Sequence, residues 1–346
     1  MGTGAKKNLK RRYLVMAAAV AILVAVWSGG WFVVRGLLDQ RIAAELDAIY
    51  GRGDRIACAE RRIGGFPFRF EIGCLQPVLI DASGLSVSLT RLKAVALVYN
   101  PWHVIFEADG PATAGFPFEG PALSAKWASA LSSIRVAGNG IRKADVAIND
   151  LDLTAAGADF GGLRAGTVGI HARPVPDTPN AIEGFASADA LRIEQPDGLA
   201  APVNARMHLR LENGLDLLSG APLSTLPRDA DGSLPIELVL LSLKSEQTEI
   251  TAAGMLRLAV DGALSGKLDL TIRGIDRADD LLSRLFPPET GIAETLKGTA
   301  IAFGTRAQDP DGAEVTRLPL TIDNGALRVG IVPLGITIPP LGAGMS

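Results

Sequence analysis

The stretch YLVMAAAVAILVAVWSGGWFVV, residues 13–34, contains no charged side chain. Built as an α-helix, its 22 residues are about 33 Å long. The hydrocarbon core of a bilayer is about 30 Å thick, so an apolar helix of this length can cross it. The stretch therefore predicts a single transmembrane anchor, with residues 1–12 on one side of the membrane and the rest of the chain on the other.

The charges that flank the anchor predict its orientation. Residues 6–12 carry five Lys or Arg and no acidic residue, whereas residues 35–47 carry charges of both signs. A positively charged flank stays on the cytoplasmic side of a membrane. We therefore expect a cytoplasmic N-terminal tail and an exported domain.

A cleaved signal peptide is the alternative interpretation of the same stretch. The apolar part of a signal peptide is about 7–15 residues long and ends at small residues. Here the stretch is longer, and Trp27, Trp31 and Phe32 stand where small residues would be needed. The tryptophans suit the aromatic belt of a membrane interface, which favours the anchor. Either interpretation exports the same domain.

The exported part of the chain is acidic. Removing the five N-terminal positive charges from the 34 Lys and Arg leaves 29, against 37 Asp and Glu, a net charge of about −8. No basic patch remains, which argues against nucleic acid as a partner. Aromatic residues are scarce, so apolar surfaces must be built mainly from Ala, Val, Leu and Ile.

Cys58 and Cys74 are the only cysteines, and both lie in the exported part. An even count in an oxidising compartment favours a disulfide bond. Two free buried thiols are the alternative. We do not expect a metal site, because no histidine lies near either cysteine in the sequence.

The anchor is expected to continue as a juxtamembrane helix over residues 35–50, because Leu38, Ile42, Leu46 and Ile49 recur at helical spacing. From residue 51 to residue 346 strand patterns dominate. The proline-rich segment 174–180 is the best candidate for a boundary within this domain.

Alternation of apolar and polar residues is clearest at residues 203–211 and 264–273, and it is typical of antiparallel strands with one wet face. Short helices are expected at residues 123–135, at residues 276–286 and from residue 290. The predicted fold is mainly β: a transmembrane helix followed by a curved or groove-like antiparallel β-sheet with a few short helices.

No catalytic motif is present. The chain lacks a nucleophile elbow, a phosphate-binding loop and a His-Glu-x-x-His or Cys-x-x-Cys sequence. His103, His171 and His208 fall on the polar side of alternating strands, as solvated sheet residues do. Asp309 and Asp311 belong to an incomplete calcium-loop pattern that is better interpreted as a turn. We therefore expect no enzyme activity, no cofactor and no metal.

The apolar face of the predicted sheet must be covered in some way. A closed sandwich and a groove completed by lipid or another hydrophobic ligand are both compatible with the pattern, and the anchor and small apolar residues favour the groove. The residues expected to face such a ligand share this apolar side of their strands: Phe66, Phe68, Phe70, Leu209, Leu256, Leu258, Leu268 and Leu270.

The sequence resembles an uncharacterised family of Gram-negative inner-membrane proteins, known as a domain of unknown function. The resemblance rests on the anchor, on GFPFR (residues 65–69) between Cys58 and Cys74, and on DNGALRVGIVPL (residues 323–334). It covers essentially the whole chain. It implies insertion in the inner membrane with the bulk of the chain in the periplasm.

Residues 253–258 and 268–274 are more distantly similar to strands of AsmA-type proteins, whose periplasmic β-grooves are implied in phospholipid traffic and envelope biogenesis. Since AsmA-type chains are usually much longer, a full bridge between membranes is not expected here. The resemblance implies a periplasmic protein that binds lipid or another hydrophobic ligand. A closed β-sandwich acting as an envelope scaffold or interaction protein is the alternative.

Overall fold

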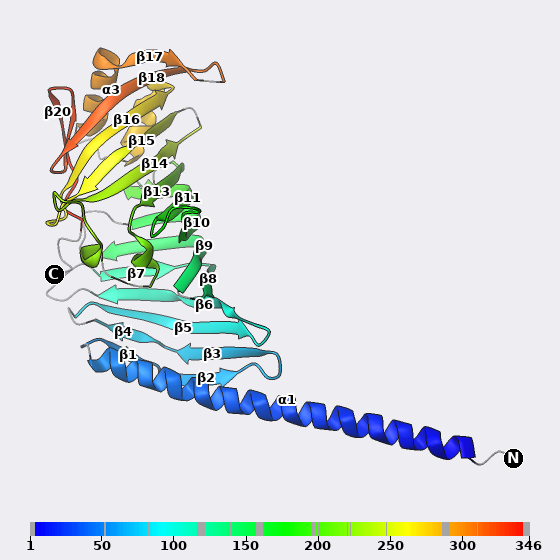
Figure 1. Ribbon diagram of the computed structural model, residues 1–346. Coiled ribbons are helices and arrows are strands. Elements are labelled where there is room, and N and C mark those ends of the chain that lie inside the picture. Colours follow the sequence, from blue (N-terminus) through cyan, green and yellow to red (C-terminus); the bar gives the residue numbers. More distant parts are fainter. Residues whose placement is uncertain are drawn as a thin grey trace.

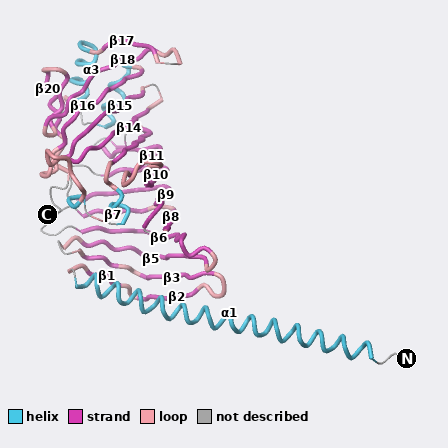
Figure 2. The backbone as a smooth tube through the Cα atoms, viewed as in Figure 1, coloured by secondary structure: helices cyan, strands magenta, loops and turns pink. Residues whose placement is uncertain are grey.

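The computed structural model consists of a long N-terminal helix beside one large antiparallel sheet (Figure 1). It describes residues 4–51, 53–81, 84–115, 122–138, 140–156, 162–195, 198–199, 201–219, 221, 223–246, 248–285, 291–309 and 311–341. Strands account for most of the described domain and helices are few (Figure 2). The predicted mainly-β fold is therefore confirmed.

The secondary-structure elements follow the chain in a simple order, with an anchor helix first, strands next and two short helices near the end. The helices are α1 (Gly4–Gly51), α2 (Ala278–Leu285) and α3 (Ile292–Phe303), with 3-10 turns η1 (Leu215–Ser219), η2 (Leu223–Thr225) and η3 (Ile275–Arg277). The strands are β1 (Arg55–Ala57), β2 (Glu60–Gly64), β3 (Arg69–Leu75), β4 (Val78–Ile80), β5 (Ser86–Leu97), β6 (Asn100–Gly115), β7 (Ala122–Lys126), β8 (Ser129–Ala137), β9 (Gly140–Ala156), β10 (Gly162–Pro174), β11 (Ile182–Gln195), β12 (Gly198–Leu199), β13 (Val203–Leu211), β14 (Leu234–Lys244), β15 (Glu249–Leu258), β16 (Leu264–Arg273), β17 (Thr305–Gln308), β18 (Glu314–Asp323), β19 (Ala326–Val329) and β20 (Val332–Thr337).

Helix α1 combines the predicted membrane span with the predicted juxtamembrane helix. Its segment Arg11–Gly51 is long and apolar enough to cross a membrane. In its C-terminal part, Leu38, Ile42, Leu46 and Ile49 are half-buried while their neighbours on the helix are exposed. The predicted stripe is therefore confirmed, and α1 runs beside the first strands of the sheet (Figure 1).

The sheet is a nearly continuous meander. Most strands pair antiparallel with the strand that follows them in space, in the order β2, β3, β5, β6, β8, β9, β10, β11, β13, β14, β15, β16 and β18. Residues 174–180, expected as a possible boundary, connect β10 to β11, and these two strands pair with each other. The sheet thus continues across this segment.

Two local expectations are corrected by the structure. The helix expected at residues 123–135 is wrong, because this segment forms β7 and β8, which pair with β6 and β9. Hydrogen-bonded pairing with β6 on one side and β9 on the other outweighs the weak helical preference of the segment. Phe66, Phe68 and Phe70 were expected on one side of a strand, but β3 begins only at Arg69, so Phe66 and Phe68 lie in the turn that precedes it.

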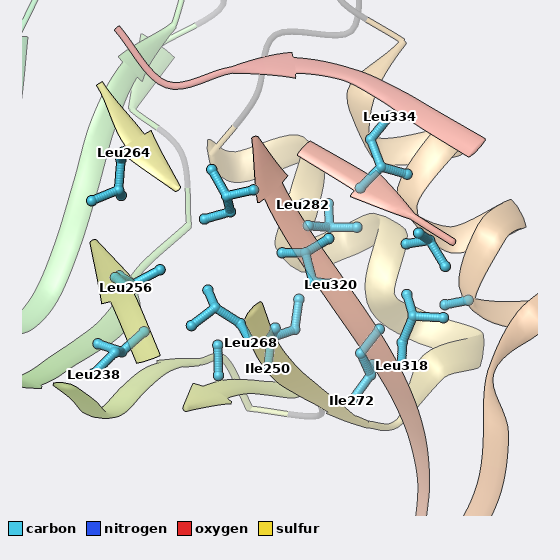
Figure 3. Packing of buried hydrophobic residues seen from close by; sticks show 14 of the residues in the cluster. Leu238, Ile250, Leu256, Leu264, Leu268, Ile272, Leu282, Leu318, Leu320 and Leu334 are labelled. Carbon is cyan, nitrogen blue, oxygen red and sulfur yellow. The ribbon is translucent and has the colours of Figure 1, made fainter. Parts of the chain in front are cut away.

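The hydrophobic core lies in the C-terminal half of the sheet. Leucine and isoleucine side chains of β14, β15, β16 and β18 pack under α2 and α3, where Leu281 is fully buried and Leu282 is 4% exposed (Figure 3). Both helices were expected from the sequence, at nearly these positions. They close the apolar face of this half of the sheet.

Candidate functional site

The N-terminal half of the sheet carries apolar side chains on a face that α2 and α3 do not cover as they cover the C-terminal half; among the described helices and turns, η1 contacts β9 and β10, and α2 contacts β11. Three rows cross eight strands, from β3 to β13, and the members of each row are direct cross-strand neighbours. We call these residues the open apolar face: Phe70, Ala96, Val104, Ile134, Ala144, Ala172, Gly184 and Leu209 in the first row; Ile72, Ala94, Phe106, Ser132, Val146, Ile170, Ala186 and Met207 in the second; Cys74, Leu92, Ala108, Ala130, Ile148, Val168, Ala188 and Ala205 in the third.

The exposure of these side chains differs from that of the C-terminal core. Apart from Cys74, every member is half-buried or exposed, and Ile170 and Met207 are 47% and 38% exposed. With neighbouring strands about 4.8 Å apart, eight strands extend over roughly 34 Å. A contiguous apolar surface of this size is unusual on a soluble monomer and marks a site of interaction.

A hollow of about 430 Å³ lies on the open apolar face, lined among others by Leu92, Phe106, Trp127 and Val146. Pockets for small molecules measure about 300–1,000 Å³. The indole Nε1 of Trp127 donates a hydrogen bond to the Ala108 carbonyl over 2.8 Å, so its polar group is satisfied away from the hollow. What remains to line it is almost entirely hydrocarbon.

Gly110 gives the Trp127 ring its position. A Cβ atom built on Gly110 would lie 3.3 Å from Cε2 of the Trp127 ring. The indole therefore lies directly on the backbone of β6, in space that a side chain at position 110 would need. This contact keeps the ring flat against the sheet at the border of the hollow.

The eight residues expected to face a ligand are divided among three places. Phe70 and Leu209 belong to the open apolar face, and Leu209, at its far end, also packs against the C-terminal core. Leu256, Leu258 and Leu268 are 7%, 2% and 8% exposed and lie in the C-terminal core, against which Leu270 also packs. Phe66 and Phe68, by contrast, lie in the turn between β2 and β3, beside α1.

Aromatic side chains join this turn to the anchor helix. The Trp31 ring is 6% exposed and stacks on Phe70 with ring centroids 5.4 Å apart. Its Nε1 donates a hydrogen bond of 3.2 Å to the Arg69 carbonyl, and Trp27 Nε1 donates one of 3.0 Å to the Pro67 carbonyl. The first row of the open apolar face thus begins against the anchor.

The predicted disulfide is confirmed. Cys58 and Cys74 are bonded, with their Cα atoms 5.5 Å apart. The bond ties the segment after β1 to β3, so it fixes the first strands of the sheet next to α1. Cys74 is also the first member of the third apolar row.

The opposite face of the same strands is polar and carries all three histidines. His103 Nε2 lies 2.8 Å from Ser133 Oγ, His171 Nδ1 lies 2.7 Å from Asp145, and His208 Nε2 lies 3.4 Å from Glu183. These contacts are cross-strand contacts of the kind that solvated sheet residues make.

Between His171 and His208 the polar face has a hollow of about 350 Å³, beside the ring of Phe185. Burial alone would raise the pKa of Asp145, but hydrogen bonds from His171 and Lys143 outweigh it and hold the pKa below 3.8. Burial would also raise the pKa of Glu183, but hydrogen bonds and charge interactions with Arg173 and His208 outweigh burial and lower this pKa. Each carboxylate is therefore held ionised between a histidine and a permanent cation.

Metal-ligand geometry is missing from this cluster. Within the described ranges, no group of three or more His, Cys, Asp or Glu side chains is placed to hold a metal ion. Asp309 and Asp311 both accept hydrogen bonds from Arg273, at 2.8 and 2.7 Å, so that acidic turn is engaged in ion pairs. The open apolar face is accordingly the better candidate for a functional site.

Sequence reasoning missed most of the open apolar face. Its alternation is visible in residues 92–96 and 104–108, but small residues such as Ala94 and Ala96 make the signal weak. Only the register of the pairings shows that these positions form continuous rows.

Comparison with known proteins assigns the chain to a family but names no activity. No curated protein and no solved structure matches the chain. A bacterial family matches residues 31–337, from the end of the anchor to the last strand. The chain therefore belongs to the family described as "Uncharacterized protein conserved in bacteria (DUF2125)".

Proposed function

We propose that this chain is a single-pass inner-membrane protein whose periplasmic sheet binds lipid, or another hydrophobic ligand, on its open apolar face. The observation that carries the proposal is the contrast between the two halves of one sheet. The C-terminal half covers its apolar side with α2 and α3, whereas in the part of the chain that the structure describes the N-terminal half leaves its apolar side open around the hollow that contains Phe106.

The chemistry of the open apolar face selects an apolar ligand. Ser132 is the single polar side chain in its three rows, and ions are confined to the opposite face. Burial of apolar surface contributes about 25 cal/mol for each Å² removed from water. A ligand such as an acyl chain lying across several strands would gain this contribution without losing hydrogen bonds.

The proposed location is supported by the anchor and by the charges that flank it. Five positive charges precede the span and the remainder of the chain is acidic, which supports a cytoplasmic N-terminus and a periplasmic sheet. A role in lipid traffic or envelope biogenesis is proposed only from the resemblance of residues 253–258 and 268–274 to strands of AsmA-type proteins, and no matching curated protein or solved structure supports it.

The test is lipid extraction and native mass spectrometry on the full chain purified in mild detergent. Phe106→Glu places a charge in the hollow and is expected to remove co-purifying lipid. Ile105→Glu is the matched control, because Ile105 is the next residue on the same strand, faces the opposite side and is 38% exposed. It is expected to keep the lipid.

Two results would count against lipid binding. Lipid-free wild-type protein from several detergents would favour the alternative, an envelope scaffold or interaction protein without a ligand. Equal lipid retention by both variants would show that bound lipid does not lie in the hollow. Melting temperatures of the two variants within a few degrees of each other establish that the comparison reports binding rather than folding.

A further inference from the structure

We propose that the turns β2–β3 and β5–β6 enter the interface of the bilayer beside the anchor, so that the sheet docks end-on against the lipid surface. The inserted side chains are Phe66 and Phe68 in the first turn and Tyr99 in the second, with Trp102 just behind. We call these four residues the docking tip. Its partner is the phospholipid bilayer in which α1 is anchored.

The length of the anchor is the first argument. Residues 13–26, which precede the first contact of α1 with the sheet, form a helix about 21 Å long. A bilayer core is about 30 Å thick. The missing length must come from the next residues, since five of the seven residues directly before Tyr13 are Lys or Arg. Trp27, Trp31 and Phe32 therefore lie within the membrane or its interface.

These same residues of α1 contact the docking tip. Trp27 lies 6.2 Å from Phe68 between ring centroids, and Phe32 stacks on Phe66 at 5.9 Å. Trp31 lies 5.4 Å from Phe66. A turn packed beside membrane-embedded side chains must lie at the same depth as they do.

Backbone carbonyls of the β2–β3 turn are hydrogen-bonded within the protein, as an environment without water requires. An apolar layer tolerates a turn only when its polar backbone groups are satisfied. The carbonyls of Pro67 and Arg69 accept hydrogen bonds from the two tryptophans of α1. The Gly65 carbonyl accepts a hydrogen bond of 3.1 Å from the Arg69 amide. The Phe68 carbonyl accepts one of 2.9 Å from the Val98 amide.

The second turn lies level with the first, because the Val98–Phe68 hydrogen bond joins them. Both turns point to the side of the sheet from which the N-terminal part of α1 extends (Figure 1). Tyr99 is 77% exposed and Trp102 65%, so their rings project from the protein. Tyr and Trp are the residues that concentrate at membrane interfaces.

End-on docking suggests a loading route, and this part rests on the proposed function. The first apolar row begins at Phe70, which stacks on Trp31 at the edge of the span. An acyl chain leaving the outer leaflet could pass from the anchor onto the open apolar face without crossing water. Insertion of the docking tip itself requires no bound lipid.

The test uses the full-length chain in vesicles of phosphatidylethanolamine and phosphatidylglycerol. One added cysteine, besides the disulfide-bonded Cys58 and Cys74, carries an environment-sensitive fluorophore and is introduced as Tyr99→Cys or, in the control, as Val260→Cys. The two sites are matched in exposure, at 77% and 76%, but Val260 lies between β15 and β16 in the C-terminal half. Brominated phospholipid is then added to the vesicles as a quencher.

We expect the label at position 99 to emit at shorter wavelength and to be quenched several-fold, while the label at position 260 behaves as in water. Equal, water-like emission at both positions would overturn the docking proposal. A second label, Phe68→Cys, must follow the result at position 99. Quenching in a protein that carries no co-purified lipid would leave docking intact and contradict lipid binding, so the two proposals fail separately.

Discussion

Single side chains decide how the anchor is joined to the domain. Trp31 combines a buried ring, a stack on Phe70 and a hydrogen bond to the backbone of β3. Trp27, one turn earlier, keeps its hydrogen bond to the β2–β3 turn but is 43% exposed. Both tryptophans contact rings of the sheet, Trp27 at 6.2 Å from Phe68 and Trp31 at 5.4 Å from Phe70, yet only Trp31 is buried.

Replacing Trp31 with alanine should loosen the anchor from the sheet. Truncation of a buried aromatic ring costs about 3–5 kcal/mol, and here the loss falls on the contact between α1 and β3. Thermal melting of the full chain in detergent should show a clear decrease. Trp27→Ala should have a smaller effect, and equal effects would contradict the packing described.

The two carboxylates of the polar face predict an acid-dependent stability. The pKa values of Asp145 and Glu183 are lowered in the folded state, from 3.8 and 4.5. A lowered pKa contributes stability above the unfolded-state value, and this contribution is lost as the pH falls through the folded-state value. Stability from these groups should therefore be complete near pH 5 and decline below it.

Denaturant unfolding across this acidic range tests the effect. The double variant Asp145→Asn and Glu183→Gln lacks both groups, so its stability should fall less steeply than that of the wild type below pH 5. At pH 7 the double variant should be the less stable protein. Parallel curves for the two proteins over the whole range would rule out the role assigned to these ion pairs.

At the scale of elements, the same sheet has a closed half and an open half. Helix α2 inserts Leu281 into the C-terminal core, where the side chain is fully buried. Ile170 on β10 belongs to the open apolar face and is 47% exposed. Both are large aliphatic residues, but only the first is surrounded by protein.

Matched truncations should reveal this asymmetry. Leu281→Ala is expected to cost about 2–5 kcal/mol, as buried leucines do. Ile170→Ala removes little buried surface and should change the free energy of unfolding by less than about 1 kcal/mol. Chemical denaturation of lipid-free protein measures both values. A large cost at position 170 would mean that protein covers the face after all.

The disulfide joins the segment after the short strand β1 to β3, which is itself held between β2 and β5. Among the described strands, β1 pairs with the equally short β4. Closing a loop of about 15 residues contributes about 3 kcal/mol in the chain-entropy model. Complete reduction should therefore lower the melting temperature, and Cys58→Ser with Cys74→Ser should melt like the reduced protein regardless of reductant. An unchanged melting temperature after verified reduction would contradict this contribution.

How far the sequence predicts this fold depends on the length and strength of each pattern. The anchor, the stripe from Leu38 to Ile49 and the helices near Leu281 rest on regular, local spacing, and all are observed. The segment around Trp127 has no clear period, and its strand structure depends on the edges of β6 and β9. Local pattern could not supply that information.

The candidate site was less accessible to prediction than the fold. Leu256 and Leu268 lie on strands whose alternation of apolar and polar residues is as regular as any in the chain, but α2 and α3 cover them. Which half of the face is covered depends on where helices distant in sequence pack. Only Phe70 and Leu209 of the expected residues therefore belong to the open apolar face.

For the whole molecule, the arrangement of anchor and sheet predicts a topology. If the N-terminus is cytoplasmic, a cysteine introduced as Val260→Cys should react with a membrane-impermeant maleimide once the outer membrane is permeabilised. A cysteine introduced as Ala5→Cys should react only after the inner membrane is broken. The reverse pattern would contradict the orientation that the flanking charges support.

The most direct measurement of the central claim is site-specific photocrosslinking in living cells. A benzophenone amino acid placed at Phe106 would face the hollow, and the same group placed at Ile105 would face the polar side of β6. The account predicts that mass spectrometry finds lipid adducts at position 106 and none at position 105. Adducts at neither position, or protein adducts alone at position 106, would contradict a lipid-binding open face.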